Sequence, residues 1–297
     1  MKVFYSDHYT IPLPDGHRFP MEKYRLIRFA LLKHGVVRDD ELLEPPLPSP
    51  EILMLAHTPA YLDAVLNGTL SEFQIRKIGF PYSKALVERS LATVGGALAS
   101  AEEALRSGVS GNLAGGTHHA FADSGEGYCV FNDLAVVAKY LRSVHKVRRV
   151  AIIDLDVHQG NGNSAILGGR DDVFIFSMHG AKNYPFRKVP STIDIDLPDE
   201  TGDRDFHTIL KDYLPKVFAF KPDVVLYQAG VDPLKEDALG RLSLTHEGLE
   251  ERDRLVLKAC RAHGIPVSLA LGGGYANPID LTVEAHVGTY KAVREVF

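Results

Sequence analysis

The stretch DLDVHQGNGN, residues 154 to 163, follows directly on the apolar run VAII and places carboxylates and an imidazole where a buried strand should end. Asp156 and His158 are two residues apart, so they point to the same side of an extended segment. Asp232, which follows a different apolar run, could lie beside them. Each residue taken alone also suits an ordinary turn or cap. Their shared position after strands favours a three-ligand divalent metal site, in which zinc keeps one position open for water and substrate.

Four further polar residues could act beside such a metal. His118 and His119 are adjacent, and a neutral imidazole there could take a proton from attacking water and return it to the leaving group. Asp154 could orient one imidazole and raise its basicity, or could simply cap the strand end. Tyr275 follows three glycines, and its hydroxyl could donate to a developing oxyanion or could pack at the edge of the core.

The elements that must position these residues alternate along the chain, which predicts an α/β fold. We expect strands over residues 2–6, 112–116, 149–156, 173–179, 223–230 and 266–275, and helices over 21–35, 83–108, 132–145, 206–220 and 244–264. Asn132 and Thr245 are expected as helix N-caps, and Gly108 and Gly264 as helix ends. Parallel sheets bind ligands beyond the carboxyl ends of their strands, and four of these predicted ends carry the polar residues. No repeat or shift in composition divides the chain, so we predict one domain over residues 1–297.

Composition limits the kind of protein. The chain has 33 Lys and Arg against 38 Asp and Glu, a net charge of -5, so electrostatics disfavours direct nucleic-acid binding. Two cysteines in 297 residues favour a reducing compartment. The start of the sequence lacks the apolar core of a signal peptide, and no apolar stretch is long enough to span a bilayer. We therefore expect a cytoplasmic protein without a membrane partner, and the sequence leaves the oligomeric state open.

A competing interpretation comes from GNGNSA at residues 160–165, which matches the G-x-G-x-x-A form of the dinucleotide-binding fingerprint. The fingerprint begins immediately after its strand, whereas four residues intervene here and Asp154 and Asp156 would repel a phosphate. The acidic residue expected about twenty positions later is also missing. The metal site is the better interpretation.

The segments GGTHHAF, GYCVFND, DLDVHQGNGN, AGVDP and LGGGY occur in the order and spacing of the histone deacetylase family, which the chain resembles over most of its length. The form HQGNG is similar to that of the class IV branch and its bacterial relatives. The resemblance implies an arginase-like α/β fold, with a mostly parallel eight-stranded central sheet and helices on both faces. It also implies hydrolysis of an acyl-amine amide with a metal-activated water, where zinc is the expected metal and iron(II) the alternative.

The resemblance also implies residue roles. It makes Asp156, His158 and Asp232 the metal ligands, His118 and His119 the tandem histidines, Asp154 the partner of the first histidine and Tyr275 the carbonyl-polarising tyrosine. A structural potassium ion is implied near Asp154 and Ser177. Gly127 and Tyr128 fall where the family's channel holds the acyl-lysine stem, although class I members have phenylalanine at the second position. The loop at residues 179–190 is interpreted as a solvated segment or as the rim of the site.

Asn161 departs from class I members, which pair the second histidine with an aspartate. Asparagine can orient His119 but cannot stabilise its charged form, so we expect His119 to stay neutral and to act as the base. The substrate stays open between acyl-lysine in a protein, an acylated polyamine and another small amide. Two different functions also stay open: an arginase-like ureohydrolase, which needs ligands for two metals, and a binding module without turnover.

Overall fold

Eight parallel strands form the central sheet of the computed structural model, which describes residues 1–297. Along the chain the strands are β1 Val3–Phe4, β2 Leu42–Leu43, β3 Val109–Asn112, β4 Val150–Asp154, β5 Val173–Gly180, β6 Ile193–Leu197, β7 Val224–Gln228 and β8 Val267–Ala270. Their spatial order is β2-β1-β3-β8-β7-β4-β5-β6, and every neighbouring pair is parallel. The predicted eight-stranded α/β fold is confirmed, with no antiparallel strand in the sheet.

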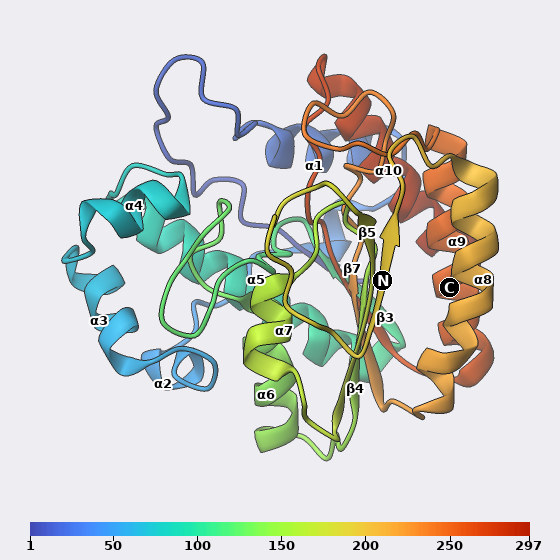
Figure 1. Ribbon diagram of the computed structural model, residues 1–297, viewed down its shortest axis with the longest axis horizontal. Coiled ribbons are helices and arrows are strands. Elements are labelled where there is room, and N and C mark those ends of the chain that lie inside the picture. The colour runs from blue at the N-terminus through green and yellow to red at the C-terminus, as the bar shows by residue number, and fades with distance from the viewer.

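Helices cover both faces of this sheet (Figure 1). They are α1 Lys23–Lys33, α2 Pro50–Leu53, α3 Pro59–Asn67, α4 Glu72–Ile78, α5 Lys84–Ser107, α6 Asp133–Val144, α7 Asn161–Leu167, α8 Asp203–Ala219, α9 His246–His263 and α10 Ile279–Val296, with a short 3-10 helix at Asp39–Glu41. Figure 1 shows α8 and α9 on one side of the strands and α5, α6 and α7 on the other. None of the helices is both long and apolar enough to cross a membrane.

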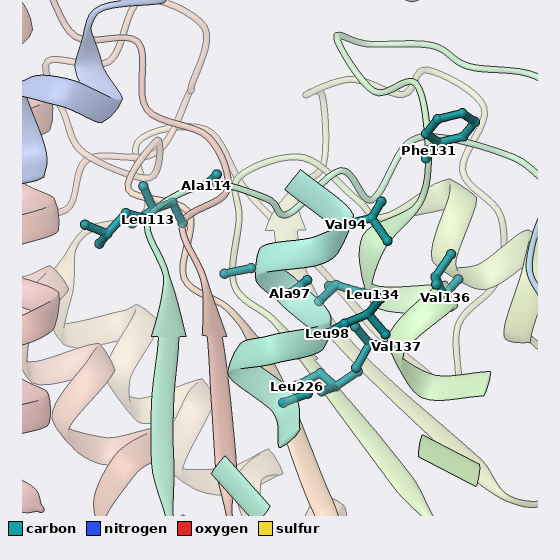
Figure 2. Packing of buried hydrophobic residues seen from close by; sticks show 14 of the residues in the cluster. Val94, Ala97, Leu98, Leu113, Ala114, Phe131, Leu134, Val136, Val137 and Leu226 are labelled. Atoms are coloured by element: carbon teal, nitrogen blue, oxygen red, sulfur yellow. The ribbon is translucent and has the colours of Figure 1, made fainter. Parts of the chain in front are cut away.

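The strands are apolar on both faces because each face is covered. In β4, Val150 and Ile152 join the core cluster that includes α5 and α6, whereas Ala151 and Ile153 join the cluster that includes α8 and α9. Figure 2 shows side chains of α5 and α6 packing together in the first cluster, with Leu98 pointing toward Leu134 and Val137. This burial on two sides explains the nearly continuous apolar runs of the middle strands, and it holds the strand ends in fixed positions.

The predicted helix boundaries at four positions are confirmed. Asn132 Oδ1 accepts a hydrogen bond from Ala135 N at the start of α6, and Thr245 Oγ1 accepts one from Gly248 N at the start of α9. Gly108 and Gly264 end α5 and α9 with φ angles of 90° and 65°, in the region that favours glycine.

Five predicted strands extend too far, among them those over residues 2–6 and 223–230, which are β1 Val3–Phe4 and β7 Val224–Gln228. The strand expected over residues 112–116 is β3, which ends at Asn112 because Gly115 and Gly116 adopt φ angles of 82° and 79° and turn the chain out of the sheet. The strand expected over 266–275 ends at Ala270, and the one over 149–156 ends at Asp154. The expectation that Asp156 and His158 lie on an extended segment was therefore wrong, since both lie in the loop after β4.

Several elements have no counterpart in the sequence prediction. The strands β2 and β6 were missed, as were the helices α2, α3, α4, α7 and α10. The β2 strand has only two residues, and β6 has the sequence IDIDL, whose acidic residues obscure a strand that lies at the sheet edge.

Candidate metal centre

The candidate site lies where the carboxyl ends of four strands meet. The strands β3, β8, β7 and β4 are consecutive neighbours in the sheet. Loops that follow these strands carry the predicted residues: His118 and His119 after β3, Tyr275 after β8, Asp232 after β7, and Asp156 and His158 after β4. Residues that are far apart in the sequence are thereby brought to the centre of one sheet edge.

Asp156, His158 and Asp232 form one buried group whose ligand-type atoms lie within 4.8 Å of one another. His158 Nδ1 is 3.0 Å from Asp156 Oδ1 and 3.0 Å from Asp232 Oδ2. Backbone amides hold the remaining carboxylate oxygens, since Val157 N donates to Asp232 Oδ1 at 2.8 Å and Gly273 N donates to Asp156 Oδ2 at 2.7 Å. The backbone thus fixes both carboxylates while their other oxygens face the imidazole.

The charges of this group fit a bound cation. Burial and the neighbouring Asp156 raise the pKa of Asp232 to about 7. Burial works against a charged His158, but Asp232 and Asp156 outweigh it and raise the pKa of that imidazole to about 10. Two carboxylates buried this close to each other require a positive partner. Two oxygen donors and one nitrogen donor suit a divalent zinc or iron ion, and no second group of this kind exists for the two metals of a ureohydrolase.

The tandem histidines have different partners. His118 Nδ1 lies 2.9 Å from Asp154 Oδ2, and His119 Nδ1 lies 2.7 Å from Asn161 Oδ1. Both histidines are buried, with ring centroids 4.1 Å apart. Asp154 is the last residue of β4 and Asn161 the first residue of α7, so a strand end and a helix start orient the two rings.

These surroundings shift the pKa values of the two imidazoles in opposite directions. Burial opposes a charged His118, but Asp154 and Asp156 outweigh it and raise its pKa to about 9. Burial and the neighbouring His118 and His158 lower the pKa of His119 well below its usual value. A neutral His119 beside a buried charged site is suited to accept a proton.

Glu126 completes the surroundings of His119, and no sequence pattern pointed to it. Asn161 Nδ2 donates to Glu126 Oε1 at 2.6 Å, and Lys77 Nζ lies 2.6 Å from Glu126 Oε2. A carboxylate can only accept, so it fixes which end of the Asn161 amide faces His119. The amide oxygen faces the ring, so His119 carries its proton on Nδ1 and keeps Nε2 free to accept. Glu126 is 35 residues from Asn161, and only the fold joins them.

Gly127 and Tyr128 line the opening of the site together with His119, His158 and Tyr275. Both adopt positive φ angles, 57° and 65°. A Cβ atom on Gly127 would lie 2.8 Å from Cδ2 of His119, so only glycine fits against that ring. The Tyr128 ring lies with its centroid 5.2 Å from that of Phe80 and 6.4 Å from that of Tyr275. Aromatic walls of this kind leave a narrow passage to the buried group.

The glycine turn before Tyr275 packs directly on the metal-type ligands. A Cβ atom on Gly273 would lie 1.8 Å from Asp232 Oδ2, so the chain can pass there only as glycine. Tyr275 N donates to Asp237 Oδ2 at 2.6 Å, which anchors the end of the turn. Burial, with Asp232 and Asp156 nearby, raises the pKa of Tyr275 well above its usual value. The phenol therefore stays protonated and can donate a hydrogen bond.

The fold and these residues define an arginase-like α/β protein with a candidate metal centre at its strand ends. Residues 17–289 match the histone deacetylase domain, and the chain belongs to the histone deacetylase family. This membership supports deacetylase or deacylase activity in general. The dinucleotide-binding interpretation of residues 160–165 is left without support by this membership. Asn161 of that segment is instead hydrogen bonded to His119.

Known relatives and solved structures agree with this assignment. The chain is 42% identical to an uncharacterised protein of Picosynechococcus sp. over 99% of both chains. It is 29% identical to histone deacetylase 2 of Arabidopsis thaliana, covering 93% of this chain and 74% of that one. It is also 29% identical to the acetoin utilization protein AcuC of Staphylococcus xylosus, covering 89% and 74%. The structure of an HDAC homolog from Aquifex aeolicus matches with a TM-score of 0.86 and 25% identity, covering 100% of this chain and 84% of that one. An HDAC homolog complexed with SAHA matches at 0.85, with 25% identity and the same coverage.

Proposed function

We propose that this protein is a metal-dependent amidohydrolase that removes an acetyl or longer acyl group from an acylated amine such as N6-acyl-lysine. The observation that carries the proposal is the buried group Asp156, His158 and Asp232 beside a neutral His119. His119, Asp156, His158 and Tyr275 line one pocket. We assign the three residues of that group as metal ligands, with zinc as the expected ion and iron(II) as the alternative. The catalytic domain comprises residues 1–297.

The metal, when bound, would activate a water molecule and polarise the acyl carbonyl. His119 is placed to accept a proton from the attacking water at Nε2, because its Nδ1–H donates a hydrogen bond to Asn161 Oδ1. Tyr275 donates its phenolic proton in a hydrogen bond to the carbonyl oxygen as negative charge develops there. His118, held by Asp154, adds a second imidazole next to the reacting atoms. As the C–N bond of the amide breaks, His119 returns its proton to the leaving nitrogen, so the products are the free amine and the carboxylic acid.

Two supporting assignments complete the proposal. Gly127 and Tyr128 hold the stem of the acylated amine in the passage to the ligands. A structural potassium ion belongs near Asp154, whose register partner on β5 is Ser177. An acylated polyamine is the alternative substrate.

The test is hydrolysis of a panel of fluorogenic acyl-lysine peptides, from acetyl to long-chain, beside acetylated polyamines. The metal-loaded wild type should turn over at least one acyl-lysine substrate, and His119→Ala should abolish the turnover. Tyr275→Phe should lower kcat by about 10²- to 10³-fold, as the loss of an oxyanion donor does. Tyr290→Phe is the matched control, because Tyr290 is buried in the core away from the cleft. Full activity of His119→Ala would overturn the mechanism.

A further inference from the structure

The opening of the site carries charge of one sign. The outer cleft, which leads from His119, His158 and Tyr275 to the surface, is lined by four cationic side chains and by no aspartate or glutamate: Arg18, Lys77, Lys182 and Arg241. The whole chain has a net charge of -5, so this cleft is opposite in sign to the rest of the molecule. Such a local surplus attracts ligands of the opposite charge.

Nearby carboxylates neutralise only part of this charge. Lys77 pairs with the buried Glu126 at 2.6 Å. Lys182 and Arg241 share a single carboxylate, Asp199, at 3.2 and 3.3 Å. Their side chains are 72% and 56% exposed, so both still face the solvent at the rim.

Arg18 is the cation of the outer cleft that has no acidic partner. It is exposed and forms no ion pair. Four cations against two carboxylates leave the cleft with a surplus of two positive charges. Phe186, whose side chain is largely exposed at the same rim, adds an apolar surface for a peptide to contact.

We propose that the acylated amine taken by this site is an acyl-lysine flanked by acidic residues in a peptide or protein segment. The inference rests on the proposed function and names its substrate class. A polyamine, or an acyl-lysine in a basic segment, would bring like charge to the surplus at Arg18 and would bind less well. Attraction between exposed charges is screened by salt, so the preference should weaken as ionic strength rises.

The test compares acetyl-lysine peptides of equal length whose flanking residues are acidic, neutral or basic, together with an acetylated polyamine. At low salt, kcat/KM should fall in the order acidic, neutral, basic, with about tenfold between the extremes for two surplus charges. Binding of the same labelled peptides, followed by fluorescence anisotropy, should show the same order. Equal binding of the three peptides, or tighter binding of the basic one, would overturn the inference.

The neutral peptide separates this inference from the proposed function. If all three peptides are hydrolysed at equal rates, the function stands and the charge preference is lost. If none is hydrolysed, the function fails, and the anisotropy order alone decides the preference.

A charge variant locates the effect. Arg18→Gln should reduce the preference for the acidic peptide over the neutral one about two- to fivefold, and Arg18→Glu should reduce it further. Arg261→Gln is the matched control, since Arg261 is exposed on the last turn of α9, which leads into the amino end of β8 at the opposite edge of the sheet. A preference that is unchanged in Arg18→Glu would overturn the assignment.

Discussion

Asn161 joins His119 to Glu126: its amide oxygen lies 2.7 Å from His119 Nδ1, and its amide nitrogen donates to Glu126 Oε1 at 2.6 Å. The negative charge of Glu126 therefore contacts Asn161, the neutral partner of the imidazole, and not the imidazole itself. This arrangement orients His119 without placing a carboxylate against its ring, which agrees with the lowered pKa of that histidine.

Replacing Asn161 by aspartate should raise the pKa of His119, because a carboxylate against Nδ1 stabilises the imidazolium. The base must be neutral to act, so the acid limb of the pH dependence of kcat/KM should move to higher pH. The new carboxylate would also face Glu126, so the double variant Asn161→Asp/Glu126→Gln serves as the control for repulsion between the two acids. An unchanged acid limb in both variants would contradict the neutral-base hypothesis.

Removing Glu126 should disturb His119 through Asn161. In Glu126→Ala the buried Asn161 amide loses its acceptor, which costs about 1–3 kcal/mol and frees the amide to turn. We expect kcat to fall about tenfold with a smaller change in KM, whereas Glu126→Gln keeps an acceptor oxygen and more of the activity. Glu103→Ala is the control, because Glu103 is a buried acid paired with Lys2 far from the cleft. Equal kcat values for Glu126→Ala and wild type would refute the positioning role.

Metal removal should lower the thermal stability. The carboxylates of Asp156 and Asp232 are buried next to each other, and a cation bound only to the folded state stabilises it by about 4 kcal/mol at a thousandfold excess over Kd. Chelation should therefore lower Tm by several degrees, and Asp232→Asn should remove this response. Elemental analysis should find about one ion per chain in the wild type. Asp212→Asn, at an exposed acid that forms no ion pair, should behave as wild type, and two ions per chain would instead favour a ureohydrolase-type site.

Stability should fall between pH 6.5 and about 4 because of His57. Burial lowers the pKa of this imidazole from 6.5 to about 4 in the folded state, so the unfolded chain binds more protons over this interval. The contribution is fully present above pH 6.5 and is lost as the pH falls toward 4, a change of about 3 kcal/mol. His57→Gln, measured by urea unfolding, should be less stable at pH 7 but should show a flatter pH dependence.

His57 matters to the site because its Nε2 accepts a hydrogen bond from Asn132 N at 2.9 Å. Asn132 caps α6 and ends the loop that carries the tandem histidines and Gly127. If the pH dependence of His57→Gln equals that of the wild type, another buried group is responsible.

The sequence by itself pointed to the chemistry that we propose for this protein. The residue types after the apolar runs, DLDVH and THH among them, already favoured metal, imidazole and carboxylate chemistry, because several such groups share one position beyond the carboxyl ends of the strands. The alternation of apolar runs with segments of helical periodicity also indicated the α/β class, and strands covered on both faces read as continuous apolar runs. These features depend on residues that are close together in the chain.

The tertiary structure alone decided how distant residues meet. The strand order brings β3, β8, β7 and β4 together, although β8 is more than 150 residues from β3, and this order places Tyr275 beside Asp232. The contact of Glu126 with Asn161 and the cationic outer cleft around Arg18 depend on the same packing. Local sequence patterns report periodicity and turns over a few residues. The order of the strands in the sheet decides which loops lie next to one another, and that order depends on burying both faces of the sheet at once.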